Sequence, residues 1–367
     1  VPHIHYDVEW IFNRERFEEV GAKNLLEVVS LMDRYQKYTF VIDQVPHLKP
    51  FFARCPKEAQ KIRNWVREGR IEAVNGLFAE PDVNLSGGES LARSSILWQR
   101  YSLREFGKLS RVGWFIDCFG QSAQLPQILA KSGTSFVAFT RIIEDDDHPT
   151  EFLWEALDGT KVIAHWMKRM YNVGYPVMAE EDLAFDRFIR TLNKLSPNRT
   201  SDQVFYPSGV DHGRPQEFPA LHLPRWNEAH PDARIIFSTP SRFFESLDKD
   251  KSPRSLGLKV VKGEFQRDLF GVYSSRIDGK IQNRVIEGKI IEAEKWSAAA
   301  SLYGFSYPEQ RFYELWEEIL GDQFHDAICG CTSDIVAEGI KRRLKAVEDS
   351  LDKIKMEALS WLASKMK

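Results

Sequence analysis

The chain has 367 residues, with 50 lysine and arginine residues against 53 aspartate and glutamate residues, so its formal net charge is −3. Hydrophobic residues make up 43% of the chain and charged residues 28%, as in ordinary globular proteins. This near-neutral balance excludes a dedicated nucleic-acid-binding protein, and no apolar run approaches the ~20 residues of a membrane-spanning helix. We therefore expect neither a nucleic acid nor a membrane as partner.

The first two-thirds of the chain alternate short β-rich runs with amphipathic helical stretches. Several of the β-rich runs are continuously apolar, which is typical of parallel strands covered on both faces. The alternation predicts an α/β layer or barrel. Strands are expected at 1–5, 38–42, 71–75, 112–117, 135–141, 161–167, 204–207 and 235–239. Helices are expected at 14–36, 58–68, 89–106, 124–131 and 181–195.

From about residue 265 the pattern is helical throughout. The segments 280–303, 308–326 and 335–366 have helical period with no strand candidate between them, which predicts an all-α three-helix bundle. The polar segment 249–258 contains proline and glycine and is the expected linker. The sequence thus predicts an α/β domain over 1–250 and a helical domain over 265–367.

Metal-capable side chains open the chain, in the run His3-Ile4-His5-Tyr6-Asp7. Alternate side chains of a strand share one face, so these three groups would converge. Imidazole nitrogens and carboxylate oxygens are good ligands for zinc and similar divalent ions. The run favours a metal site, although several unrelated classes of hydrolase share this pattern.

Three further segments carry acids or histidine at element ends. Asp117 ends the predicted strand 112–117, where α/β folds place catalytic groups, and Ser122 is better placed to cap the next helix. Asp211 lies in a glycine-bounded turn, where a catalytic and an ordinary turn aspartate are equally expected. The pair His325-Asp326 lies at a helix end, where pairing with the helix dipole is the simpler interpretation.

These four segments, in this order, resemble glycoside hydrolase family 38, the retaining α-mannosidases. The resemblance covers nearly the whole chain and includes further runs, at 76–82, 88–90, 124–127 and 271–276. It implies a seven-stranded (β/α) barrel-like domain with parallel strands, followed by the three-helix bundle. Members commonly continue into β-rich domains, which are absent from this chain.

The resemblance also implies roles for individual residues. It makes Asp117 the nucleophile and Asp211 the general acid/base, and it gives His3 a supporting role only. The implied metal ligands are His5, Asp7, Asp117 and His325. The implied substrate contacts are Trp10, Phe119, Arg141, Tyr171 and Asp326.

The chemistry implied is hydrolysis of terminal α-linked mannose by double displacement, with an α-mannoside or a mannose-containing oligosaccharide as substrate. One divalent ion is expected, zinc first, with cobalt and calcium as alternatives. That cation and Arg141 would keep the pKa of Asp117 low, whereas Asp211 would lie in a less polar setting and stay protonated for the first step.

Two other functions stay open at this point. The first is another metal-dependent hydrolase, of amidohydrolase or sugar deacetylase type, in which a metal-bound water attacks. The second is an inactive carbohydrate-binding fragment. Association into homo-oligomers or with the missing C-terminal domains is also open. The few cysteines and the lack of a visible leader favour a cytoplasmic location over a secreted or lysosomal one.

Overall fold

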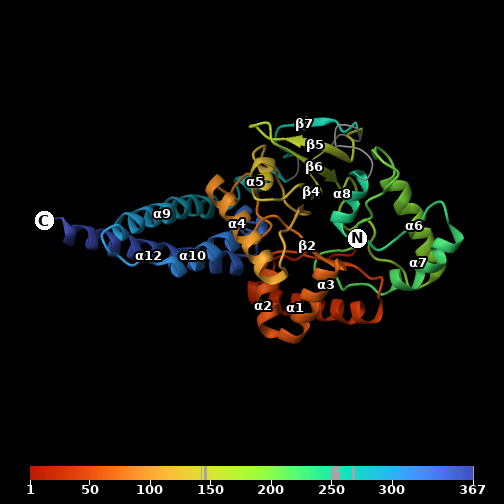
Figure 1. The fold of residues 1–367 in the computed structure, drawn as a ribbon, viewed down its shortest axis with the longest axis horizontal. Coiled ribbons are helices and arrows are strands. Elements are labelled where there is room, and N and C mark those ends of the chain that lie inside the picture. The colour runs from red at the N-terminus through yellow and green to blue at the C-terminus, as the bar shows by residue number, and fades with distance from the viewer. Residues whose placement is uncertain (142, 144–146, 249–256, 267–268, 367) are drawn as a thin grey trace.

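The computed structural model describes residues 1–141, 143, 147–248, 257–266 and 269–366. An α/β body occupies one end of an elongated molecule, and long helices of the C-terminal region extend from it (Figure 1). Most of the predicted linker 249–258 lies outside the described residues. No described helix is both long enough and apolar enough to cross a membrane.

The strands of the α/β body form two sheets within the described residues. The larger sheet has the order β3-β4-β6-β5-β7, and β1 and β2 form the smaller one. All neighbouring strands run parallel except β5 and β6, which are antiparallel. An isolated bridge from Asn75 to Gly113 connects the end of β2 to β3. The bounds are β1 (Phe40–Ile42), β2 (Ile71–Ala73), β3 (Val112–Phe115), β4 (Phe136–Phe139), β5 (Glu151–Glu155), β6 (Lys161–Trp166) and β7 (Val260–Lys262).

The mixed α/β fold with parallel strands is therefore confirmed, whereas a closed seven-stranded barrel is not. Residues 1–5 form no continuous strand: they meet the segment after Pro207 only in single bridges, Pro2 with Ser208 and His5 with Asp211. The strand predicted at 204–207 is wrong, and Pro207 brings no amide hydrogen to a ladder there.

The strand predicted at 235–239 is also wrong, because side chains take the backbone groups that a ladder would use. The side chain of Asn227 accepts from the Ile235 amide at 2.7 Å and donates to the Ile235 carbonyl at 2.8 Å. The hydroxyl of Thr39 donates to the Ser238 carbonyl at 2.8 Å. The sequence interpretation missed β5 and β7, which are short and carry charged residues at their ends.

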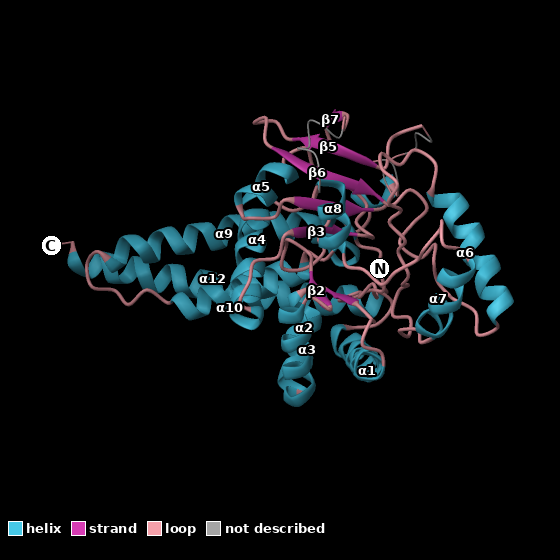
Figure 2. Cartoon of the chain, turned by 45° about the vertical axis from the view of Figure 1, so that its right-hand side comes forward, coloured by secondary structure: helices cyan, strands magenta, loops and turns pink. Residues whose placement is uncertain are grey.

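Helices surround these sheets and make up the C-terminal region (Figure 2). The five helices expected in the α/β part are present, and α2, α7 and α8 were not expected. The bounds are α1 (Arg14–Arg34), α2 (Val45–Arg54), α3 (Pro56–Glu68), α4 (Gly88–Phe106), α5 (Leu125–Lys131), α6 (Glu181–Leu195), α7 (Phe218–Ala229) and α8 (Pro240–Asp248).

The C-terminal region contains the 3₁₀ helix η1 (Phe270–Tyr273), the long helices α9 (Ile277–Ser301), α10 (Glu309–Asp322) and α12 (Asp334–Lys365), and the short helix α11 (His325–Cys329). Helices α9 and α12 pack along each other and both contact α10. The helix predicted at 308–326 is interrupted after Asp322, because Phe324 is extended and bridges to Pro81. The helical region therefore has three long helices in mutual contact and the additional short helix α11, and the plain three-helix bundle of the prediction is not confirmed.

One buried apolar cluster joins the two regions. It includes Leu97 and Trp98 on α4, Ile290 on α9 and Trp316 on α10. Beside it lies an ionic cluster in which Asp322 accepts from Arg14 Nη2 at 2.9 Å and from Arg343 Nη2 at 2.6 Å. Glu9 is the second acid of this cluster and also pairs with Arg343. The start of the chain is thus fixed to α10 and α12.

Replacing Asp322 with alanine should destabilise the protein by about 3 kcal/mol, since it removes the buried carboxylate that Arg14 and Arg343 share and leaves them only Glu9 and the more exposed Glu318. The side chain of Asp322 is 1% exposed, whereas those of Arg14 and Arg343 are 20% and 30% exposed, which keeps the loss near the lower end of the range for such pairs. Urea unfolding measures it. The control is Asp33→Ala, whose exposed pair with Lys61 should contribute less than about 1 kcal/mol. Equal losses in the two variants would contradict the prediction.

Candidate metal centre and active site

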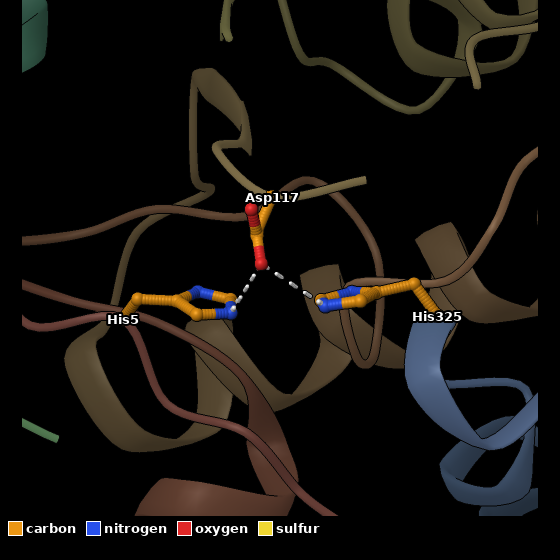
Figure 3. A group of neighbouring side chains, drawn as sticks. All are labelled: His5, Asp117 and His325. Atoms are coloured by element: carbon orange, nitrogen blue, oxygen red, sulfur yellow. Dashed lines mark ion pairs between the residues drawn. The ribbon is translucent and has the colours of Figure 1, made fainter. Parts of the chain in front are cut away.

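Three of the predicted ligands meet at one buried point (Figure 3). Asp117 Oδ2 lies 3.8 Å from His5 Nε2 and 3.9 Å from His325 Nε2. The two imidazole rings face each other, with centroids 5.5 Å apart and planes inclined by 20°. Both histidine side chains are 0% exposed. Residues far apart in the sequence therefore present two nitrogens and one oxygen to the same space.

Asp7, the fourth predicted ligand, lies beside this group. Its Oδ1 is 3.1 Å from His5 Nε2. Asp326 Oδ2 is 3.8 Å from His325 Nε2. Asp7, His325 and Asp326 each offer one ligand atom within 4.8 Å of the other two, as do His5, Asp117 and His325. The structure thus brings together all four predicted ligands and adds Asp326 to them.

Asp117 and His325 reach this point from the ends of elements, and His5 reaches it from an isolated bridge. His5 is held by its bridge to Asp211, and Asp117 follows β3 at the carboxyl end of the sheet. His325 begins α11 directly after the Phe324–Pro81 bridge. Carboxyl ends of parallel strands are where α/β folds place functional groups. The interruption between α10 and α11 is what brings a histidine of the helical region into contact with them.

The chemistry of these side chains fits a divalent cation. Nε2 of His5 and Nε2 of His325 are buried and have no hydrogen-bond partner among the described residues. Nδ1 of His325 lies 2.8 Å from the Glu80 carbonyl, to which it donates, so Nε2 keeps its lone pair. Zinc takes imidazole nitrogen and carboxylate oxygen ligands, and an orienting carbonyl on the other ring nitrogen is usual for such histidines.

Electrostatics point the same way. Burial opposes protonation of His5, but Asp7 and Glu80 raise its pKa well above the ordinary value. Burial also opposes ionisation of Asp7, whose pKa is nevertheless lowered by His5 and His212. Since carboxylates outnumber the histidines here, the pocket attracts positive charge.

Asp117 is bound to Arg141, as the resemblance implied. Arg141 Nε donates to Asp117 Oδ1 at 2.7 Å, and Nη2 donates to the same oxygen. Arg141 follows β4 and has φ of +51°, a conformation that non-glycine residues adopt mainly where the surroundings impose it. Burial raises the pKa of Asp117, whereas His5, His325 and Arg141 act in the opposite direction. Arg141 thus acts on this pKa in the expected direction, and the expected effect of a bound cation stays a prediction.

Asp211 and Tyr171 form the next pair. The Tyr171 hydroxyl donates to Asp211 Oδ1, and the Tyr171 ring lies 5.6 Å from that of His5. Burial, followed by the charges of Asp117 and Asp211, raises the pKa of Tyr171, so the phenol is neutral and close to both carboxylates. Asp211 itself is exposed, so the less polar setting expected for it is wrong for this chain.

The remaining predicted substrate contacts differ in their placement. The Phe119 ring lies edge-on to His325 at 5.2 Å, and the Arg141 guanidinium lies 5.6 Å from the Phe119 ring centre. Burial raises the pKa of Asp326 to about 7. Trp10 is half-buried against the apolar cluster that joins the two regions, and its carbonyl accepts from the Ser333 amide at 3.0 Å. Trp10 therefore lies where the chain enters the site, and its contact with a sugar stays a prediction.

Two residues to which the sequence interpretation gave no role also lie in the site. His212 Nε2 is 2.7 Å from Asp7 Oδ2, and its ring stacks on Phe17 of α1 at 4.2 Å. Glu80 is 0% exposed and contacts His5, Asp117 and His325. Glu80 lies in the segment between β2 and α4, inside the run 76–82 that carries part of the family resemblance, and that run was the signal that could have found it.

The comparisons with known proteins support the family resemblance. Residues 1–276 match the family described as glycosyl hydrolases family 38 N-terminal domain, and residues 269–362 match the alpha mannosidase middle domain. Alpha-mannosidase 2C1 of Homo sapiens is 28% identical over 92% of this chain, and alpha-mannosidase G of Dictyostelium discoideum is 27% identical over 93%. These matches cover 32% and 31% of the two relatives, so the chain spans about a third of their length.

Among solved structures, an alpha-mannosidase from Enterococcus faecalis V583 has a TM-score of 0.91 with 23% identity, covering 99% of this chain and 42% of that one. At this identity the likeness shows the fold. The family match over most of the chain, by contrast, shows descent. The chain belongs to glycosyl hydrolase family 38, whose curated relatives here are named as α-mannosidases.

Proposed function

We propose that this chain carries the catalytic centre of a retaining, metal-dependent α-mannosidase, which hydrolyses terminal α-linked mannose in an α-mannoside or mannose-containing oligosaccharide. The observation that supports this most is the position of Asp117. One of its oxygens lies within 4 Å of both imidazoles, and the other accepts hydrogen bonds from Arg141. A carboxylate held in this way can both bind a cation and attack a sugar.

The residues that would hold the cation, preferably zinc, are His5, Asp7, Asp117 and His325. When bound, the ion supplies Lewis-acid coordination of neighbouring sugar hydroxyls, which orients a ring with an axial O2. Asp326 lies against the same group, where a second carboxylate could accept a hydrogen bond from a sugar hydroxyl. Phe119 and Trp10 would contact the apolar face of the ring.

In the first step, Asp117 attacks the anomeric carbon while Asp211 donates its proton to the leaving oxygen, which breaks the glycosidic bond and forms a glycosyl ester. In the second, Asp211 takes a proton from water, the water oxygen attacks the anomeric carbon, and the ester to Asp117 breaks. Retention requires the two carboxyl groups about 5–5.5 Å apart. Tyr171, hydrogen-bonded to Asp211, would orient the acid.

Trapping the glycosyl ester tests this mechanism directly. A 2-deoxy-2-fluoro mannosyl substrate with a good leaving group should form the ester faster than water removes it, because fluorine slows both steps and the leaving group restores the first. Mass spectrometry of the digested protein should find one added fluoromannosyl group on the peptide that contains Asp117. A hydrolase in which a metal-bound water attacks would give no adduct, and an adduct on another residue would contradict our assignment.

Metal dependence gives a second test. Removing the ion with a chelator should reduce turnover of an aryl α-mannoside to background, and adding Zn²⁺ should restore it, because the four ligands then regain their common partner. Wild-type chain that binds Zn²⁺ without turnover would favour a carbohydrate-binding fragment. We also propose a cytoplasmic location, since all four cysteines are free thiols.

A further inference from the structure

Glu80 connects the segments that carry the three central ligands. Its side chain is 0% exposed, and the residue lies in the segment between β2 and α4. Oε1 accepts from the Asp117 amide at 2.8 Å, and Oε2 lies 3.3 Å from Nδ1 of His5. One carboxylate therefore faces both the backbone of the candidate nucleophile and a candidate metal ligand.

The backbone of Glu80 makes the third connection. Its carbonyl accepts from the His325 amide at 3.0 Å and from His325 Nδ1 at 2.8 Å. Its amide donates at 3.1 Å to Oε1 of Gln44, whose Nε2 donates at 2.8 Å to the Tyr6 carbonyl. Gln44 is 0% exposed and has φ of +56°. Gln44 thus holds the Glu80 backbone in place, and this supports the contacts that Glu80 makes with the candidate ligands.

We propose that Glu80 is a positioning residue that sets the orientation and the proton position of the metal-binding imidazoles. With Nδ1–H of His5 facing the carboxylate and Nδ1–H of His325 facing the carbonyl, both Nε2 atoms would keep a lone pair for a cation held beside Asp7 and Asp117. A carboxylate on the outer nitrogen also makes the imidazole a stronger ligand. This inference rests on the proposed function, because it concerns how the same cation is held.

The two contacts of the side chain require a carboxylate. Its Oε1 accepts from the Asp117 amide, and its Oε2 lies at ion-pair distance, 3.3 Å, from Nδ1 of His5 without forming a hydrogen bond in this structure. A glutamine of the same shape has one acceptor and one NH₂, so either orientation leaves a donor facing a donor in a buried place. The contact with His325 uses the backbone and survives such a substitution. Glu80→Gln should therefore disturb His5 and Asp117 but not His325.

The experiment uses the full chain, stripped of metal and titrated with Zn²⁺ against a chromogenic chelator. Glu80→Gln should weaken Zn²⁺ binding by about 10–100-fold, as loss of such outer partners does elsewhere. It should lower kcat for an aryl α-mannoside more than it changes KM. The matched control is Glu151→Gln, since Glu151 is 1% exposed and its Oε1 lies 2.8 Å from Nδ1 of His165, outside the site. The control should lose stability while its Zn²⁺ affinity changes less than about twofold.

A double-mutant comparison assigns the effect to its partner. In a His5→Ala background, Glu80→Gln should lose most of its effect on Zn²⁺ affinity, whereas in a His325→Ala background it should keep it. Unchanged Zn²⁺ affinity in Glu80→Gln, or an equal loss of Zn²⁺ affinity in Glu151→Gln, would overturn the inference. The proposed function would still stand in that case if the wild-type chain binds Zn²⁺ and turns over substrate. Wild-type chain that neither binds Zn²⁺ nor turns over substrate would defeat the proposed function instead.

Discussion

Replacing Asp117 with asparagine should lower kcat for an aryl α-mannoside by at least about 10⁴-fold, on the scale seen when a nucleophile is removed from other hydrolases. The amide cannot form the glycosyl ester, and it offers the two histidines a neutral oxygen or an NH₂ in place of a carboxylate. Its shape is nearly that of aspartate, so the fold should persist. Steady-state kinetics measure the loss, and thermal unfolding of the metal-free protein checks the fold. The matched control is Asp33→Asn on the exposed surface of α1, which should keep full turnover.

Azide can separate the roles of the two acids. In Asp117→Ala, azide should enter the space of the nucleophile and displace the leaving group once, giving the β-mannosyl azide. In Asp211→Ala, with a substrate that needs no protonation, azide should attack the ester and give the α-mannosyl azide. The anomeric configuration, read by NMR, therefore identifies each residue. The same product from both variants would contradict the assignment of Asp117 and Asp211.

Loss of the hydrogen-bond partner of a metal ligand weakens metal binding by about 10–100-fold. Replacing His325 with alanine should weaken Zn²⁺ binding by more than this, because it removes a ligand itself. Zinc at about 100 times its Kd stabilises a folded protein by about 2.7 kcal/mol, and the variant should lose most of this gain. Thermal unfolding with and without Zn²⁺ measures the difference. Without the ion the variant should stay folded, since the Phe324–Pro81 bridge and the Asp322 ionic cluster remain.

The control for this prediction is His230→Ala, because His230 stacks on Trp226 at 3.8 Å at the end of α7, away from the candidate centre. It should keep the Zn²⁺-dependent increase in melting temperature. If His325→Ala showed the same increase as the wild-type chain, His325 would not be a ligand.

The parts of the fold that the sequence predicts best are those in which local pattern and final contacts agree. The run before Asp117 is apolar because β3 is buried, so both the strand and the acid at its end can be recognised. The segment 235–239 is apolar too, yet the side chain of Asn227, in a different element, decides its structure. Such competition from distant side chains leaves no local pattern.

The site follows the same division. His5 and Asp7 share a face through their spacing, and that much is local. The approach of His325 to them depends on where α10 ends and on a bridge to Pro81. No local pattern predicts either feature, so only the family resemblance implied this contact. Glu80 was missed because its contact with His325 uses a backbone carbonyl, which every residue possesses.

The bridge between Phe324 and Pro81 places the candidate centre at the contact between the α/β body and the helical region. Neither region holds all the predicted ligands, since His5 and Asp117 come from the α/β body and His325 comes from the helical region. A chain cut at the end of the family's N-terminal match would keep β3 and Asp117, but it would lose His325. The Glu80 carbonyl would then have lost its partner, and the candidate centre one of its predicted ligands. The candidate centre is therefore complete only where the two regions pack together.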